Sequence, residues 1–197
     1  KIKIEGDGVA VDLTDSDPQA EGNTNSTMAN THAAIYYVLI AIVDPDMPAN
    51  SGCYRPIDVI TKAGSVVDPI LPGAVAARTN CSQKIVEAMY KAFAPLTPDR
   101  VTAGSHGQIT TCGFGGTDTN NGERFIYTEI QVGGNGARPT KDGADGQDGH
   151  LPRFMNTPIE AVETRFPVRI ERYGFVPDSG GAGTFRGSLA MVRDVKL

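Results

Sequence analysis

Several signatures of common protein chemistries are missing from this sequence. Its 197 residues contain no GxxxxGK[ST] phosphate-binding loop and no GxSxG nucleophile elbow, and its three cysteines form no CxxC pair. These absences disfavour ATP binding by this chain alone, a serine nucleophile of the elbow type and a zinc knuckle. Three widely spaced thiols, at Cys53, Cys81 and Cys112, are typical of reduced cysteines in a cytoplasmic protein.

Clustered positive charge and long apolar runs are also missing. The net charge is −5, and no group of Lys and Arg forms a basic patch, so we expect no nucleic-acid partner. The longest apolar run, residues 33–43, is shorter than the roughly 20 residues that cross a bilayer, and it lies too far into the chain for a signal peptide. We therefore expect no membrane association and a cytoplasmic location.

The pattern of potential metal ligands is weak. The three histidines are far apart in the sequence, and an isolated histidine on a predicted helix is usually a packed, hydrogen-bonded side chain. Asp142, Asp145 and Asp148 recur every third residue, whereas an EF-hand needs acidic ligands every second residue and a glutamate at the twelfth position. We assign no metal ligand to this chain and keep calcium at these aspartates as a minor alternative.

Hydrophobic periodicity predicts an α+β fold, with a largely antiparallel sheet, two main helices and long glycine-rich loops. The main helices are expected over residues 28–43 and 82–96. Ile85, Val86, Met89, Phe93 and Leu96 form the apolar stripe of the second helix, which should face the core. A short helix is expected over residues 158–165, and strands over residues 1–5, 9–13, 56–61, 65–67, 109–114, 125–132, 167–176 and 189–197.

Residues 133–150, GGNGARPTKDGADGQDGH, form a polar loop that cannot contribute to a core. A flexible linker, a metal loop and a stiff loop that lines a site are the competing interpretations. Flexible glycine linkers are rich in serine and poor in charge, whereas this loop carries Arg138, Lys141 and three aspartates. Asp–Gly units can form successive tight turns, so we favour the stiff loop, and a plain solvent loop stays open.

A second glycine-rich segment, residues 180–187, has the sequence GGAGTFRG. Its backbone N–H groups are suited to an anion, but a dinucleotide fingerprint follows a strand and opens a helix. Because this segment instead precedes a predicted strand, we do not interpret it as a nucleotide site. The preceding Asp178–Ser179–Gly180 is interpreted as a turn.

Five blocks of sequence, in chain order, carry a resemblance to a known family. They read VDLTDSDPQAEGNTNST, NSGCYRPIDVITKAGSVVDPILPGAVAART, PDRVTAGSHG, GGNGARPTKDGADG and NTPIEAVETRFPVRIERYGFVPDSGGAGTFRG. They are distributed over nearly the whole chain, from residue 11 to residue 187, and they resemble the hydantoinase B / oxoprolinase family.

The resemblance implies membership of a larger ATP-dependent enzyme. Subunits of this family work with a hydantoinase A-type subunit that binds ATP, and together they open cyclic amides such as 5-oxoproline, N-methylhydantoin or lactams. Phosphorylation of an enol or imidate oxygen is the implied activation. Related complexes carboxylate acetone or acetophenone, so a ketone carboxylase is the alternative activity, and a non-catalytic assembly module is the alternative of a different class.

The resemblance also implies that much of the enzyme lies outside this sequence. The family's metal-binding motifs lie in an N-terminal half that this sequence lacks, so ATP and a divalent metal are expected in the full complex but not on this chain alone. We expect residues 1–197 to be a single domain or fragment from the C-terminal part of a B-type subunit, inactive in isolation. A start without methionine, inside a predicted strand, agrees. The implied partners are the A-type subunit, the missing half and a small cyclic amide.

Candidate site residues follow from the polar loop and the matching blocks. Arg138 is suited to a forked pair with a carboxylate or phosphate, with Asp142 and Asp145 orienting it or holding a turn. Asn50 and Asp178 are assigned to the same substrate or interface lining, and no catalytic residue is assigned. Because residues 33–43 are apolar on nearly every face, we also expect the isolated chain to expose an apolar patch and to associate.

Overall fold

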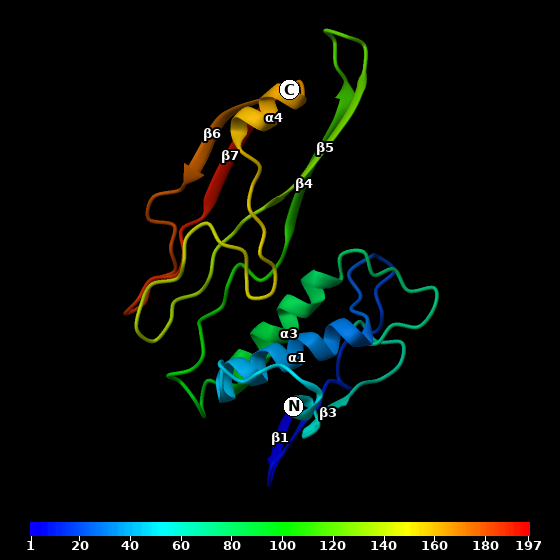
Figure 1. The fold of residues 1–197 in the computed structure, drawn as a ribbon, viewed down its shortest axis with the longest axis vertical. Helices are drawn as coiled ribbons and strands as arrows, with labels where there is room; N and C mark the ends of the chain where they lie inside the picture. Colours follow the sequence, from blue (N-terminus) through cyan, green and yellow to red (C-terminus); the bar gives the residue numbers. More distant parts are fainter. The chain divides into compact units, whose positions relative to one another are not determined.

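The computed structural model describes residues 1–197, which divide into two compact units, Lys1–Ala103 (unit 1) and Gly104–Leu197 (unit 2). Four helices and three small sheets, mostly antiparallel, confirm the α+β prediction (Figure 1). None of the helices combines the length and the hydropathy that a membrane crossing requires. Whether the two units act as a single domain stays a prediction.

Unit 1 contains a three-stranded sheet. The two strands predicted at residues 1–5 and 9–13 form a hairpin: β1 (Ile2–Glu5) and β2 (Gly8–Asp12) pair antiparallel across a tight turn where Gly6 has a φ of 60°. On its other side β2 pairs with β3 (Ile57–Ile60) in parallel. The strand predicted at residues 65–67 is wrong, because this segment forms a turn with isolated bridges from Ser65 to Pro18 and Asp68.

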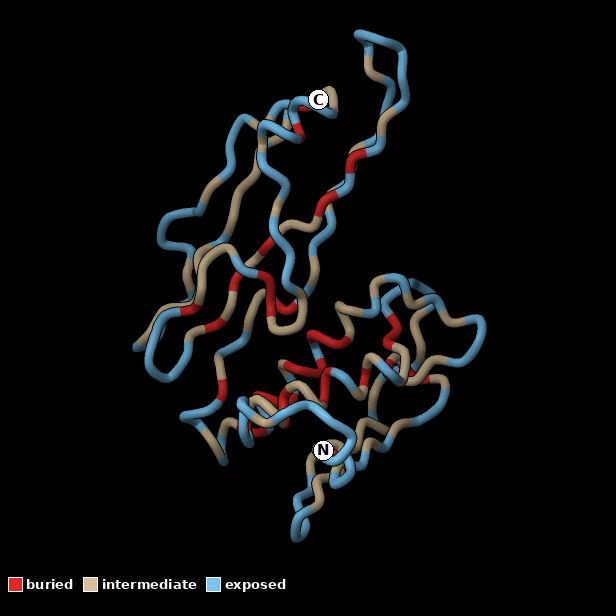
Figure 2. Tube along the Cα trace, in the orientation of Figure 1, coloured by how far each residue is buried: buried red, intermediate tan, exposed pale blue.

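Two helices form the core of unit 1. α1 (Met28–Val43) begins where Thr27 accepts a hydrogen bond from the Asn30 N–H, and it packs against α3 (Arg78–Phe93). α2 (Ser51–Tyr54) is a single turn capped by Asn50. Buried stretches run along both long helices (Figure 2), and their buried apolar residues are Ala34, Ile35, Val38, Leu39, Ile42, Ile85, Val86, Met89, Tyr90 and Phe93.

The second helix differs from its prediction at both ends. The helix begins at Arg78, before the predicted residue 82. The prediction missed this first turn because the turn is polar and carries no apolar periodicity. It ends at Phe93, so Leu96 lies past the helix and is 68% exposed instead of continuing the core stripe.

Unit 2 consists of two hairpins and a short helix. β4 (Thr110–Thr117) pairs with β5 (Arg124–Gln131), β6 (Arg169–Phe175) pairs with β7 (Met191–Lys196), and α4 (Ile159–Arg165) contacts β6. These elements confirm the predicted strands and short helix to within a few residues. Tyr127, Val162 and Val168 form the buried core, with Phe114, Phe125, Phe166 and Val195 packed around it.

Candidate functional site

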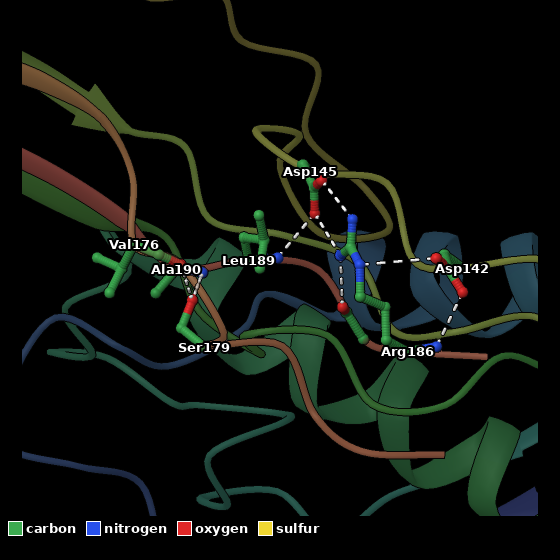
Figure 3. Close-up of polar contacts among 8 residues, drawn as sticks. Asp142, Asp145, Val176, Ser179, Arg186, Leu189 and Ala190 are labelled. Carbon is green, nitrogen blue, oxygen red and sulfur yellow. Dashed lines mark hydrogen bonds and ion pairs between the residues drawn. The ribbon is translucent and has the colours of Figure 1, made fainter. Parts of the chain in front are cut away.

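The polar loop is hydrogen-bonded to one arginine that lies about 40 residues further along the chain. Arg186 donates from Nη1 and Nη2 to the two carboxylate oxygens of Asp145, at 2.9 and 2.8 Å, and its backbone N–H donates to Asp142 at 2.9 Å (Figure 3). The Leu189 N–H also donates to Asp145, at 2.7 Å. Hydrogen bonds from Arg186 and Leu189 lower the pKa of Asp145 to about 2, so this carboxylate is ionised at neutral pH.

Glycines let the same segments approach closely. A Cβ on Gly134 would lie 1.7 Å from the Ser188 hydroxyl oxygen, and a Cβ on Gly143 would lie 2.1 Å from the Asn135 carbonyl oxygen. Backbone hydrogen bonds join the segments at these places, from Ser188 N–H to Asn135 at 3.1 Å and from Gly143 N–H to Arg186 at 2.8 Å. The polar loop is therefore a bonded part of unit 2, as the stiff-loop interpretation requires.

Asp142 and Asp145 make other contacts than those expected around Arg138, whose pairing with a carboxylate or phosphate stays a prediction. Its guanidinium group is exposed, and its backbone pairs with Lys141 in a turn. Asp142 and Asp145 bind Arg186 and do not orient Arg138, because the backbone of residues 142–145 lies beside the segment that carries Arg186.

The two other candidates, Asn50 and Asp178, take part in local turns of the backbone. Asn50 accepts from the Gly52 N–H at 2.8 Å and donates to the Pro48 carbonyl at 2.9 Å, in unit 1. Asp178 is exposed and takes a φ of 55°, which makes the turn before Ser179. The Ser179 hydroxyl then donates to Val176 and accepts from Ala190, both at 2.7 Å, and closes this turn (Figure 3). The assignment of Asn50, Arg138, Asp142, Asp145 and Asp178 to a substrate or interface surface stays a prediction.

Unit 2 contains a cleft of about 620 Å³ beside these segments. Its lining comes from residues 104–112, 131–135 and 179–193, so it includes the start of the polar loop, the glycine-rich segment and β7. Apolar side chains such as Val132, Leu189 and Met191 share its wall with polar ones such as His106 and Asn135. Volume and mixed lining are typical of small-molecule sites.

A buried ion pair borders the cleft. Glu129 on β5 and Arg193 on β7 form an ion pair, and their side chains are 7% and 6% exposed. The Tyr127 hydroxyl and the Thr157 N–H each donate to the Glu129 carboxylate at 2.5 Å. Burial opposes the ionised form, but these bonds and the Arg193 charge hold the pKa of Glu129 below its usual value. Burial and the bond to Glu129 raise the pKa of Tyr127 to about 12.

His106 and Asp148 interact electrostatically; Asp148 is buried and His106 is partly buried. The His106 ring packs against Gly133, where a Cβ would lie 2.3 Å from the ring, and its Nδ1 accepts from the Gly134 N–H at 3.4 Å. Asp148 is 5% exposed, and neither of its carboxylate oxygens has a hydrogen bond of normal geometry. Burial raises the pKa of Asp148, while the His106 charge and the Phe154 N–H oppose that shift.

Sequence reasoning missed Arg186, Glu129, Arg193 and His106 as members of this site. Glu129 and Arg193 lie within alternating strands, where a charged residue is normally interpreted as solvent-facing. Arg186 carried one available signal, because it is the charged residue of the glycine-rich segment 180–187, inside a matching block.

This chain shows neither a metal-ligand cluster nor a phosphate-binding loop motif. No group of three or more His, Cys, Asp or Glu side chains gathers in a geometry that would hold a metal ion. The chain has no phosphate-binding loop of the GxxxxGK[ST] type. We therefore derive no chemical step through either group on this chain.

Comparison with known proteins identifies the family. The model of the family Hydantoinase B/oxoprolinase matches residues 1–197. The chain belongs to this family. Over its full length, this family member is 32% identical to a protein named as the B-type subunit of a D-/L-hydantoinase, from Pseudomonas sp. (strain NS671). It is also 33% identical, over its full length, to 5-oxoprolinase 1 of Arabidopsis thaliana. It spans 34% of the first protein and 15% of the second, so it corresponds to a part of each.

Two solved structures share the fold. The ATP-dependent caprolactamase from Pseudomonas jessenii matches 99% of this chain and 34% of its own, with a TM-score of 0.84 and 29% identity. A nucleotide-free acetone carboxylase matches 96% of this chain and 26% of its own, with a TM-score of 0.76. At 17% identity, the second likeness shows the fold alone.

Proposed function

We propose that this chain forms part of an ATP-dependent enzyme that hydrolyses cyclic amides. The observation that carries the proposal is the likeness to the ATP-dependent caprolactamase, which extends over 99% of the chain at a TM-score of 0.84. The relatives named as a hydantoinase and a 5-oxoprolinase support the same class, because hydantoin, 5-oxoproline and caprolactam are all cyclic amides.

We further propose that ATP and a divalent metal bind outside this chain, and that an A-type subunit in the cytoplasm supplies the ATP site. The chain spans 34% of the hydantoinase relative, which leaves most of such a protein to provide these groups. Three free cysteines agree with a reducing compartment. In this arrangement the chain contributes the walls of a site, and the isolated chain is inactive.

Ring opening by the intact protein tests this proposal. The protein that contains this chain is purified with any ATP-binding subunit that accompanies it, and ADP release and ring-opened product are measured with 5-oxoproline, hydantoin and caprolactam. We expect at least one of these cyclic amides to be opened in step with ATP hydrolysis. No ring opening under conditions where ATP is hydrolysed would contradict the proposal.

A ketone carboxylase is the second candidate, favoured by the fold shared with acetone carboxylase. The same preparation is incubated with acetone and bicarbonate, and acetoacetate is measured. Acetoacetate without ring opening would support the carboxylase. Stable assembly with the partner and no turnover in either assay would support the third alternative, a non-catalytic assembly module.

A further inference from the structure

Buried polar atoms without partners gather around the cleft of unit 2. His106 Nε2, Asn135 Oδ1, and Nε and Nη2 of Arg193 are buried and have no hydrogen-bond partner, and all three residues line the cleft. Folded proteins satisfy the great majority of their buried polar atoms, so each exception needs a physical explanation. Their concentration at one cleft indicates a site for a ligand whose polar atoms complement them.

The unpartnered atoms include both donors and an acceptor. His106 Nδ1 accepts from the Gly134 N–H, so with this contact the ring proton lies on Nε2 and that atom is a donor. Arg193 offers N–H donors only, whereas Asn135 Oδ1 is an acceptor. A complementary ligand therefore presents at least one acceptor oxygen and one N–H group.

The electrostatic balance favours a neutral ligand. Glu129 forms an ion pair with Arg193 and also accepts from Tyr127 and Thr157, so the guanidinium charge is already balanced by an ionised carboxylate. A charged ligand would lose its hydration without gaining an unbalanced cation. A carbonyl oxygen loses far less on burial and can use the spare guanidinium donors.

The rest of the cleft suits the hydrocarbon part of such a ligand. Val132, Leu189, Ala190, Met191 and Val192 lie along its wall. Methylene groups of a ring gain free energy on transfer from water to an apolar wall. The volume of about 620 Å³ holds a small ring and leaves room for substituents.

We propose that this cleft binds a small neutral amide, whose carbonyl oxygen accepts from Arg193 and His106 and whose N–H donates to Asn135. The cyclic nature of the amide rests on the proposed function; the binding pattern rests on the cleft. Because the free atoms of Arg193, His106 and Asn135 all lie within the wall, these three side chains reorient toward the ligand on binding, a change of a common kind.

Binding to the intact protein without ATP tests this site. Isothermal titration is performed with ε-caprolactam and 2-pyrrolidinone as neutral amides, and with acetate and phosphate as anions. The test variants are Asn135→Leu, which removes the acceptor, and Arg193→Lys, which keeps the charge beside Glu129 but removes donors. Asn120→Leu and Arg172→Lys make the same chemical changes at exposed positions of unit 2 and serve as matched controls.

We expect the neutral amides to bind more tightly than the anions. Each test variant should weaken amide binding about tenfold, and each control should stay within about twofold of the wild type. Asn135→Leu should leave the melting temperature of the ligand-free protein unchanged or higher, because it removes an unsatisfied buried acceptor. A lower melting temperature together with unaltered amide affinity would assign Asn135 a structural role and overturn the inference.

Two other results would also overturn it. One is tighter binding of acetate or phosphate than of the amides. The other is a structure of the intact protein in which another part of the polypeptide fills the cleft. Binding is measured without ATP, so the two proposals can fail separately. Amide binding without turnover would contradict the proposed function and leave this site intact. Turnover together with unchanged amide affinity in the variants would contradict this site and leave the proposed function intact.

Discussion

Asp145 and Asp148 lie three residues apart in the polar loop, yet their surroundings shift their pKa values in opposite directions. Asp145 accepts from Arg186 and the Leu189 N–H, and its pKa falls to about 2. Asp148 is buried without a hydrogen bond of normal geometry, and its pKa rises. At this scale the number and direction of nearby donors decide the charge of a carboxyl group, and the residue type does not.

For Asp145, the pH dependence of stability follows from the lowered pKa. The native state binds fewer protons than the unfolded state between the ordinary value of 3.8 and about 2, so the stabilisation is present above 3.8 and is lost as the pH falls toward 2. Asp145→Asn should remove this part of the acid dependence and lower the melting temperature at neutral pH. Thermal unfolding between pH 2 and pH 7, followed by circular dichroism, measures both, and parallel curves for the two proteins would contradict the assignment.

Asp148 should show the opposite sign. Its folded-state pKa is raised, so the native state binds more protons than the unfolded state, and stability falls as the pH rises above the unfolded value. Asp148→Asn should raise the free energy of unfolding at neutral pH by about 1 kcal/mol, since it removes the cost of burying an unsatisfied charge. The gain should vanish at acid pH, where the wild-type carboxyl is protonated. Chemical denaturation at both pH values measures this, and a loss of stability at neutral pH would show that the charge is stabilised by His106.

Among the elements of unit 2, β5 and β7 are joined by a buried ion pair as well as by apolar packing in the core. Glu129 and Arg193 are both nearly inaccessible, and the Arg193 guanidinium also lies over the Tyr173 ring, 5.1 Å from its centroid. Within the hairpin of β6 and β7, which also carries Arg193, Arg172 and Asp194 form an ion pair that is largely exposed. The two pairs offer a matched comparison within unit 2.

Loss of the buried arginine should be costly. Arg193→Met leaves Glu129 buried and unpaired, which we expect to lower the free energy of unfolding by about 3–5 kcal/mol. Arg172→Met should change it by less than about 1 kcal/mol, because its partner stays solvated. Urea denaturation of both variants measures the difference, and equal effects would show that burial does not set the strength of these pairs.

Close packing of the polar loop gives a second prediction for the elements. Gly143→Ala places a methyl group 2.1 Å from a backbone oxygen, so the loop must move away from its partners, at a cost of about 1–3 kcal/mol. Gly181→Ala is the matched control, because a Cβ there meets nothing within 4 Å. The melting temperatures of the two variants distinguish them. A harmless Gly143→Ala would indicate a loop that adapts, contrary to the stiff-loop interpretation.

At the scale of the whole molecule, the expected apolar surface has a different origin from the one predicted. The apolar helix α1 does not lack cover, since Ala34, Ile35, Val38 and Leu39 are buried within this chain. Val43, at the end of α1, is 60% exposed, but most exposed large apolar residues lie elsewhere and include Leu71, Leu96, Ile126 and Met155. The reasoning from helix periodicity identified a buried helix but could not specify its partner, α3.

Association of residues 1–197 nevertheless stays a prediction. Leu71 and Met155 are each 93% exposed and Ile126 is 80% exposed, so contact with a partner or a second copy would remove apolar surface from water. Light scattering on a purified sample should give a mass above that of the monomer, and an apolar dye should bind. A monomer that binds no dye at micromolar concentration would contradict the prediction.

The sequence by itself determined the α+β class, the helix at residues 28–43, the strands of unit 2 and the family resemblance. These features depend on local periodicity, on turn residues and on contiguous motifs, and each of these signals lies within a short stretch of sequence. Only the tertiary structure decided that Arg186 binds Asp142 and Asp145, that Glu129 pairs with Arg193, and that Asp148 interacts electrostatically with His106. Each of these interactions joins residues about 40 or more positions apart, and no local pattern encodes which distant charges meet once the backbone has folded.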